Sequence, residues 1–165
     1  MDSQEYFTRI EKNEFDRLKK LILIDPNLVK AKKKSGSSGL HASVVNGAID
    51  AAKVLIEMGI DVNSQDEDGQ TALHYCAENY QFEVAKIILE HGGNLSISDK
   101  YGNQPLWTST FNIQNDLTGL DILELFLLNG ADVNHQNNVG KTPWEIAHDP
   151  YFEPIILLMK KYSAV

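Results

Sequence analysis

Cysteine is nearly absent from this sequence of 165 residues, which contains only Cys76. A single cysteine excludes an internal disulfide framework and is typical of proteins from a reducing compartment. The first residues lack the basic and apolar segments of a secretory signal, so we expect no such signal. Long apolar runs are missing too, because the longest, around 123–128, is interrupted by Glu124 and is far shorter than the ~18 residues that span a bilayer. These absences predict a globular, cytoplasmic protein that does not bind membranes.

Basic charge is also scarce. The chain has 15 Lys and Arg against 23 Asp and Glu, which gives a net charge of -8. The imbalance is local: residues 1–35 carry 9 basic and 6 acidic side chains, 36–139 carry 3 and 14, and 140–165 carry 3 and 3. An acidic chain lacks the basic footprint that phosphate contacts need, which argues against nucleic-acid binding. The acidic middle either serves solubility alone or steers a basic partner to the protein.

The sequence repeats itself with a period of 33 residues. Two sets of positions keep this step: Gly36, Gly69 and Gly102, and Leu40, Leu73 and Leu106. After Leu106 the step becomes 38, as from Gly102 to Gly140, so five residues are inserted within 112–119. Projection of the pattern to both ends of the chain gives five copies, at about 3–35, 36–68, 69–101, 102–139 and 140–165.

Each copy predicts two short helices followed by a polar, turn-rich finger. In the third copy, Thr71 suits the residue that caps a helix start, and Leu73 and Cys76 give the first helix an apolar face with small residues. Val84, Ile87, Ile88 and Leu89 have helical spacing, and Gly92 suits the left-handed position after a helix. One such helix pair cannot bury its apolar face alone, so the copies must stack around a continuous core. The sequence therefore predicts an all-α repeat solenoid, one domain over 1–165 with its end copies as caps.

The residues that could carry chemistry are few. His41 and His74 occupy equivalent positions, where a histidine either braces the turn between copies or acts as a ligand, and the repeat favours bracing. The remaining histidines lie in different copies without metal-ligand spacing: His91, His135 and His148. The acidic cluster at 66–68 lacks the glycine and distal glutamate of a calcium loop and is better interpreted as a solvated fingertip. Cys76 is expected to be buried and inert. No catalytic residue, metal or cofactor is therefore expected.

Four segments resemble the ankyrin-repeat signature: Gly59–Asn63, Asp68–His74, Gly130–Asn134 and Lys141–Trp144. The resemblance recurs in register and extends over nearly the whole chain. It implies the ankyrin fold, in which β-turn fingers project from stacked helix pairs. It also implies a non-catalytic module that binds another protein.

Ankyrin proteins contact their partners through the fingers and the first helix of each repeat, and the resemblance extends this role to matching positions here. In repeats three to five these positions are Gln65, Glu67, Asp68, Gln70, Glu78, Asn79, Lys100, Tyr101, Asn103, Phe111, Asn112, Asn138 and Val139. Others of the same kind are Lys32, Lys34, Ser35, Val45, Asn46, Lys141 and Asp149.

Three features of this surface leave alternatives open. Tyr101 and Phe111 are aromatic at exposed positions, either as binding hot spots or as incidental surface. Tyr80 and Trp107 replace a glycine and a histidine of the signature, either as repacking or as recognition surface. The insertion within 112–119 is either a tolerated loop or a second contact region.

Two stretches, 99–107 and 137–147, resemble a subgroup of small bacterial ankyrin proteins that accompany toxins. This finer resemblance implies a cytoplasmic immunity protein, monomeric when unbound, that neutralises one cognate toxin by covering its active site or substrate groove. A basic toxin would suit the acidic middle. The alternative is a general adaptor, or an inhibitor of an endogenous enzyme, that uses the same surface. An enzyme would need a pocket with converging titratable groups, which a repeat stack rarely forms.

Overall fold

The computed structural model describes residues 3–113, 117–147 and 153–162. Within these ranges the chain forms ten α-helices, one short 3-10 helix and no strand. The 3-10 helix η1 (Pro26–Lys30) follows the first pair of helices. The pairs are α1 (Ser3–Glu11) with α2 (Phe15–Ile24), α3 (Gly39–Val45) with α4 (Ile49–Glu57), α5 (Ala72–Asn79) with α6 (Phe82–Glu90), α7 (Pro105–Asn112) with α8 (Leu120–Leu128), and α9 (Pro143–Ile146) with α10 (Glu153–Tyr162).

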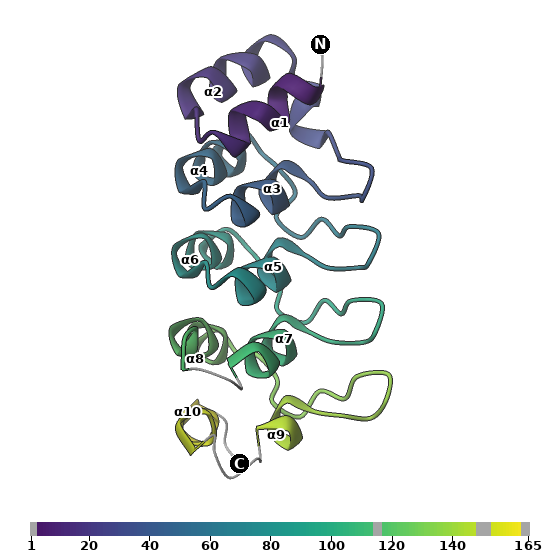
Figure 1. Ribbon diagram of the computed structural model, residues 1–165, viewed down its shortest axis with the longest axis vertical. Coiled ribbons are helices and arrows are strands. Elements are labelled where there is room, and N and C mark those ends of the chain that lie inside the picture. Colours follow the sequence, from purple (N-terminus) through teal and green to yellow (C-terminus); the bar gives the residue numbers. More distant parts are fainter. Residues whose placement is uncertain (1–2, 114–116, 148–152, 163–165) are drawn as a thin grey trace.

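The helix pairs stack on one another along the long axis of the molecule (Figure 1). The first helices of the pairs form one row and the second helices form another row beside it, and loops project on one side as fingers. We call the two rows the inner row (α1, α3, α5, α7, α9) and the outer row (α2, α4, α6, α8, α10). The prediction of an all-α repeat solenoid is confirmed. The division into five repeats with the stated boundaries stays a prediction.

A histidine fixes the start of two inner helices. The Thr71 backbone N–H donates to His74 Nδ1 at 3.0 Å, and the Thr71 hydroxyl lies 2.9 Å from the same nitrogen. Ser38 and His41 make the same arrangement one layer earlier. Because Nδ1 accepts this bond, the neutral ring carries its proton on Nε2, which is free to donate to the next layer.

The core runs without interruption between the two rows. Leu40, Leu73 and Leu106 have no exposed surface and lie at equivalent positions of α3, α5 and α7. Small buried residues let neighbouring helices approach closely: Ala51, Ala52, Ala72, Cys76, Ala77 and Ala85. Stability in such a stack is a sum over layers and the interfaces between them. The expectation that Cys76 is buried is confirmed, and burial raises the pKa of its thiol well above the usual range.

The link between α7 and α8 is longer than the corresponding links of the layers before it. It occupies 113–119, whereas 80–81 joins α5 to α6 and 46–48 joins α3 to α4. The predicted insertion falls here, and its residues 114–116 lie outside the described residues. Tyr80 ends α5 in the left-handed conformation, with φ 54°, and its hydroxyl donates to the Asn112 carbonyl at 3.3 Å. Its ring lies directly against Gly119, so two departures from the repeat meet in space.

Candidate protein-binding surface

A side-chain oxygen closes the turn at the tip of each of three fingers. Asp66 Oδ1 accepts the backbone N–H groups of Asp68 and Gln70, both at 2.9 Å. Asp99 and Asn137 do the same in the next two fingers at 2.8–3.1 Å. A turn held by its own side chain needs no partner to order it, so the fingertips are arranged before binding.

Backbone hydrogen bonds also join each fingertip to the next. They run from Glu67 N–H to Ser35 O at 3.0 Å, from Lys100 N–H to Asp68 O at 2.8 Å, and from Asn138 N–H to Tyr101 O at 2.9 Å. Three exposed residues lie at equivalent positions along this row: Asp68, Tyr101 and Val139. The fingers therefore form one connected surface rather than separate loops.

The last two fingertips expose large apolar side chains. Tyr101 is 60% exposed and Val139 is 79% exposed. The Lys100 side chain contacts both a carboxylate and an aromatic ring. Its Nζ lies 2.6 Å from Asp68 Oδ1 and 5.0 Å from the centroid of the Tyr101 ring. The hydrogen bond to Asp68 raises the pKa of Lys100. Lys100 thus neutralises one acidic residue and braces Tyr101.

The inner helix α5 contributes the carboxylate of Glu78 to the middle of this surface, beside the finger residue Asp66. Gln70 Nε2 donates to Glu78 Oε1 at 2.6 Å, and the Tyr75 hydroxyl donates to Asp66 Oδ2 at 2.9 Å. Loss of hydration around its carboxylate raises the pKa of Glu78; the hydrogen bond from Gln70 lowers it, and the charges of Asp66 and Asp99 raise it further. Glu78 therefore adds a third negative charge to this part of the surface, near Asp66 and Asp99.

An aromatic pair lies on α7, next to these carboxylates in the stack. The Trp107 and Phe111 rings stack with centroids 5.1 Å apart and an interplanar angle of 12°. Phe111 is 51% exposed and occupies the position on α7 that Glu78 has on α5 and Val45 has on α3. The indole Nε1 of Trp107 is buried and has no acceptor among the described residues. The stacked pair therefore presents a flat apolar platform.

The structure places most of the predicted contact residues at the surface. The exposed ones are Gln65, Glu67, Asp68, Glu78, Asn79, Lys100, Tyr101, Phe111, Asn138 and Val139. Gln70 and Asn112 are partly buried. Of the further positions, Lys32, Lys34, Ser35, Val45, Asn46 and Lys141 are exposed, and Asp149 lies outside the described residues. We use the name finger surface for the exposed residues of both sets.

Asn103 differs from the other predicted contacts, because its side chain is only 8% exposed. Its Nδ2 donates to Asp99 Oδ2 at 3.3 Å, its Oδ1 accepts from Asn137 Nδ2 at 2.9 Å, and its carbonyl accepts from His74 Nε2 at 3.0 Å. These hydrogen bonds occupy the polar atoms of Asn103 inside the stack, so its side chain has little surface with which to contact a partner.

Two contacts were not expected from the sequence. Tyr75 links α5 to the fingertip through Asp66, and its ring lies edge-on to His41, with centroids 4.9 Å apart. Tyr80 packs on Gly119. No feature of the sequence predicts the contacts of Tyr75. The Tyr80 contact could have been found, because Tyr80 and the insertion depart from the repeat in adjacent copies.

The part of the chain that the structure describes holds neither a metal cluster nor a membrane-spanning helix. No group of three or more His, Cys, Asp and Glu could hold a metal ion there. In the same residues no helix is both long enough and apolar enough to cross a membrane. His41 and His74 brace the layers, as the repeat predicts, since His41 Nε2 lies 3.1 Å from Gln70 O and His74 Nε2 lies 3.0 Å from Asn103 O.

A stack of helix pairs with one connected row of fingers defines a helical-repeat protein of the kind that binds other macromolecules. The family model for ankyrin repeats, in three copies, matches residues 9–100 and 40–137. The chain therefore belongs to the ankyrin-repeat family, a family of non-catalytic protein-interaction modules. The serine/threonine-protein kinase VIK of Arabidopsis thaliana is 41% identical to it over 54 residues, which are 33% of this chain and 12% of that kinase. The match thus spans a small part of the kinase.

Proposed function

We propose that this chain is a bacterial cytoplasmic immunity protein that binds one cognate toxin tightly and covers its active site or substrate groove. The observation that carries the proposal is the composition of the finger surface, where an ordered acidic centre is flanked by exposed aromatic side chains. Exposed aromatic residues supply most binding hot spots, and an ordered surface loses little entropy on binding. The resemblance of 99–107 and 137–147 to toxin-associated ankyrin proteins supports the choice of partner.

The charge of the finger surface suggests the chemistry of that partner. Residues 36–139 carry 14 acidic against 3 basic side chains, and the charges of Asp66 and Asp99 both act on Glu78. A partner with a basic surface would provide the missing cations and would associate faster through electrostatic steering. A toxin that acts on nucleic acid would carry such a surface.

The test has two steps, because the toxin must first be identified. Tagged wild-type protein and a Phe111→Asp variant are each used to purify bound proteins from the native host and from cells in contact with it, and the bound proteins are identified by mass spectrometry. A partner retained by the wild type and lost by the variant is then expressed in Escherichia coli with and without this chain. We expect the partner to stop growth alone and to be harmless together with the wild-type chain.

Two controls make this test decisive. Leu128→Asp changes an exposed residue of the outer row and should leave both capture and protection intact. Raising the salt concentration should slow association, because charge steering is screened over a Debye length of about 8 Å at physiological salt. A specific partner that is a harmless housekeeping enzyme or scaffold would disprove the immunity function and support the adaptor alternative.

A further inference from the structure

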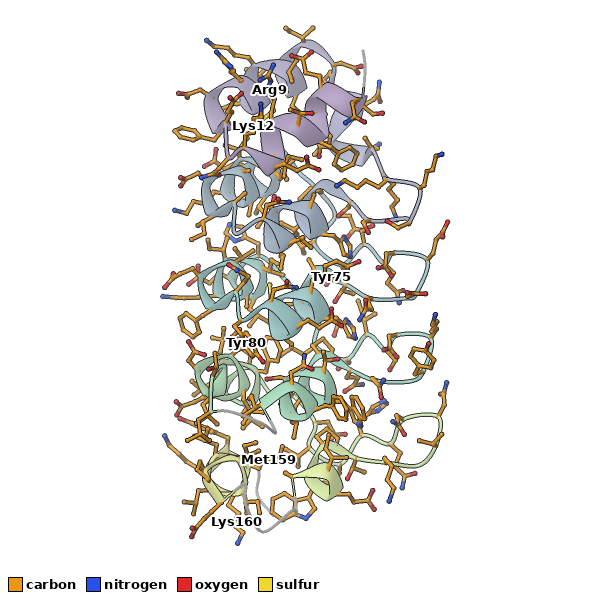
Figure 2. All side chains as sticks on the ribbon, viewed as in Figure 1. Arg9, Lys12, Tyr75, Tyr80, Met159 and Lys160 are labelled. Atoms are coloured by element: carbon orange, nitrogen blue, oxygen red, sulfur yellow. The ribbon has the colours of Figure 1, made fainter. Side chains whose placement is uncertain are left out.

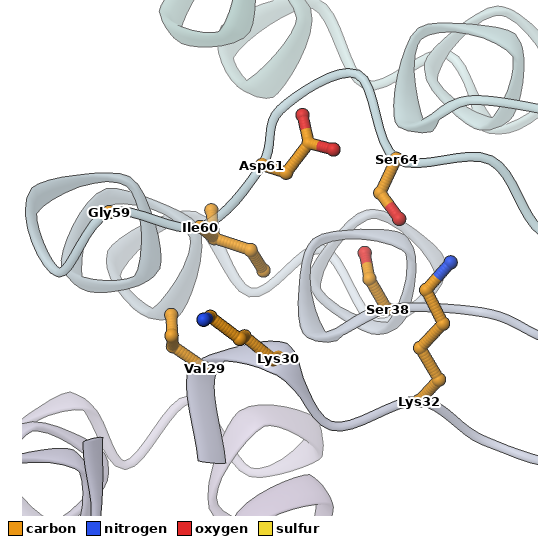
Figure 3. Close-up of a pocket in the computed structure, with 8 residues that line it drawn as sticks. All are labelled: Val29, Lys30, Lys32, Ser38, Gly59, Ile60, Asp61 and Ser64. Carbon is orange, nitrogen blue, oxygen red and sulfur yellow. The ribbon is translucent and has the colours of Figure 1, made fainter. Parts of the chain in front are cut away.

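A cavity of about 350 Å³ lies between the first two layers of the stack, away from the fingertips (Figure 3). It lies between the end of η1 and the loop that follows α4 and is partly open to solvent. Its lining residues are Val29, Lys30, Lys32, Ser38, Gly59, Ile60, Asp61 and Ser64. This volume falls within the range of small-molecule pockets.

The repeat explains why the space is open. One layer later, Asn63 fills the equivalent position: its Oδ1 accepts the Asn94 backbone N–H at 2.8 Å and its Nδ2 donates to the Gly92 carbonyl at 3.0 Å. Thirty-three residues earlier, Lys30 replaces Asn63. An ammonium group cannot accept an N–H, so lysine cannot make this bridge.

The backbone groups that the bridge would reach are Gly59 C=O and Asp61 N–H, and both residues line the cavity. With Lys30 at this position, the hydrogen-bonded bridge is absent and a positive charge lies beside the pocket. The loop after α4 therefore lacks the side-chain bridge that joins the loop after α6 to the layer before it.

The walls combine positive charge with apolar surface. Val29 and Ile60 form the apolar part, and Lys30 and Lys32 bring ammonium groups from two sides (Figure 3). Lys32 is held in place because its Nζ donates to Gln65 O at 2.9 Å. The Asp61 carboxylate belongs to its own turn, where Oδ1 accepts the Asn63 N–H at 3.0 Å. The two lysines thus leave the lining with a net positive charge.

We propose that this cavity binds a small organic anion whose charged group meets Lys30 and Lys32 and whose apolar body lies against Val29 and Ile60. Charge-assisted hydrogen bonds to the two ammonium groups supply the affinity for the anion. The Ser64 hydroxyl and the Asp61 N–H add neutral donors. The site shares only Lys32 with the finger surface and does not rest on the proposed toxin partner.

Phenyl phosphate is a suitable probe, because it joins a dianion to a flat apolar ring. In a titration of the isotope-labelled chain followed by NMR, we expect saturable shifts of the Asp61 and Ser64 amide signals. Lys30→Asn should weaken binding by at least about tenfold, because it removes a charged donor and closes the cavity with the Asn63-type bridge. The same variant should raise the Tm by about 2–4 °C through that bridge. Lys86→Gln, at an exposed lysine of α6 outside the cavity, should change the affinity by less than about twofold.

Inorganic phosphate and benzyl alcohol separate the two halves of the proposal. Each should bind at least about tenfold more weakly than phenyl phosphate, since one lacks the apolar body and the other lacks the charge. No saturable shift with phenyl phosphate, equal binding of benzyl alcohol, or equal binding of inorganic phosphate would each overturn the proposal. A positive result for this cavity says nothing for or against the toxin partner, and the reverse holds as well.

Discussion

Successive junctions of the stack are fastened in different ways. From α3 to α7, a buried histidine at the start of each inner helix reaches the next layer: His41 bonds to Gln70 O and His74 bonds to Asn103 O. From α7 to α9, Trp107 stands at the histidine position, and its ring stacks on Phe111. That junction is joined by the next finger, where His135 Nε2 donates to Gly102 O at 3.0 Å and Asn137 Nδ2 donates to Asn103 Oδ1 at 2.9 Å.

The fold therefore tolerates two ways of joining neighbouring layers, and they differ in the side chains that they leave exposed. A histidine at this position makes its hydrogen bonds inside the stack, to its own helix cap and to the next layer. A tryptophan there gives up the interlayer hydrogen bond and supports an exposed aromatic ring instead. Figure 2 shows how side chains fill the space between all the layers, so the change is local and the stack stays continuous.

The largest expected effect breaks the first kind of junction. His74→Ala removes a helix cap and an interlayer hydrogen bond and leaves the Thr71 N–H without its acceptor. We expect the free energy of unfolding to fall by about 2–4 kcal/mol, measured by urea denaturation with far-UV circular dichroism. His91→Ala is the matched control, because His91 is exposed, and it should change stability by less than about 0.5 kcal/mol. A loss below 1 kcal/mol for His74→Ala would contradict the bracing role, since it would fall within the usual range of one ordinary hydrogen bond, about 0.5–1.5 kcal/mol.

The second effect concerns the link beside the Trp107 junction. In Gly119→Ala, the new Cβ would lie 2.6 Å from Tyr80 Cδ1, in a residue with φ 89°. We expect a loss of about 2–3 kcal/mol, of which about 1–2 kcal/mol is the left-handed backbone alone. Gly130→Ala tests the backbone term, because its φ is 80° and nothing lies within 4 Å of the new Cβ. If both variants lose the same stability, Tyr80 does not pack on the link; otherwise Tyr80→Ala should reduce the difference.

The third effect is on partner binding. Phe111→Ala and Tyr101→Ala should each weaken binding of the captured partner at least about tenfold, since both side chains are exposed and aromatic. The Tm should change little, because neither ring is buried in the core. Leu128→Ala removes an equally exposed apolar side chain from the outer row and should leave the affinity unchanged. Isothermal titration calorimetry measures all three, and unchanged affinity for both aromatic variants would remove these residues from the binding site.

A pH titration distinguishes the histidine junctions. Burial lowers the pKa of His41 and of His74, because each ring loses the hydration that stabilises its charged form. The unfolded chain, with histidine pKa values of about 6.5, therefore takes up protons first, and the stability present above about pH 6.5 falls as the pH drops toward the lowered folded values. We expect the free energy of unfolding to be about 1 kcal/mol smaller at about pH 5.5 than at about pH 7.5. The double variant His41→Gln/His74→Gln should show a flatter profile, and an unaltered profile would assign the dependence to other groups.

The smallest expected effect comes from introducing the histidine-type junction between α7 and α9. In Trp107→His, the ring nitrogen Nε2 would face the Lys141 carbonyl, the position equivalent to Gln70 and Asn103. We expect stability to rise by about 0.5–1 kcal/mol from one added hydrogen bond, with weaker partner binding because Phe111 loses its stacked support. Chemical denaturation and calorimetry of the same preparation measure both. A clear loss of stability would show that the indole is needed for packing rather than for the surface.

Sequence by itself determined the repeat architecture of this protein. Leu40, Leu73 and Leu106 recur every 33 residues because each copy carries its own helix caps and apolar face, which are local properties. The positions of the fingers and of most exposed contacts, such as Tyr101 and Phe111, follow from that period for the same reason.

Tertiary structure alone decided which polar and aromatic groups are used inside the stack. Asn103 is enclosed by bonds to Asp99, Asn137 and His74, and Tyr80 lies on Gly119, although most of these partners are about 30 residues apart in sequence. The cavity beside Lys30 has the same origin, because it depends on what the next layer places opposite that residue. Periodicity fixes where a side chain stands in its own layer, whereas its contacts depend on the layer stacked against it.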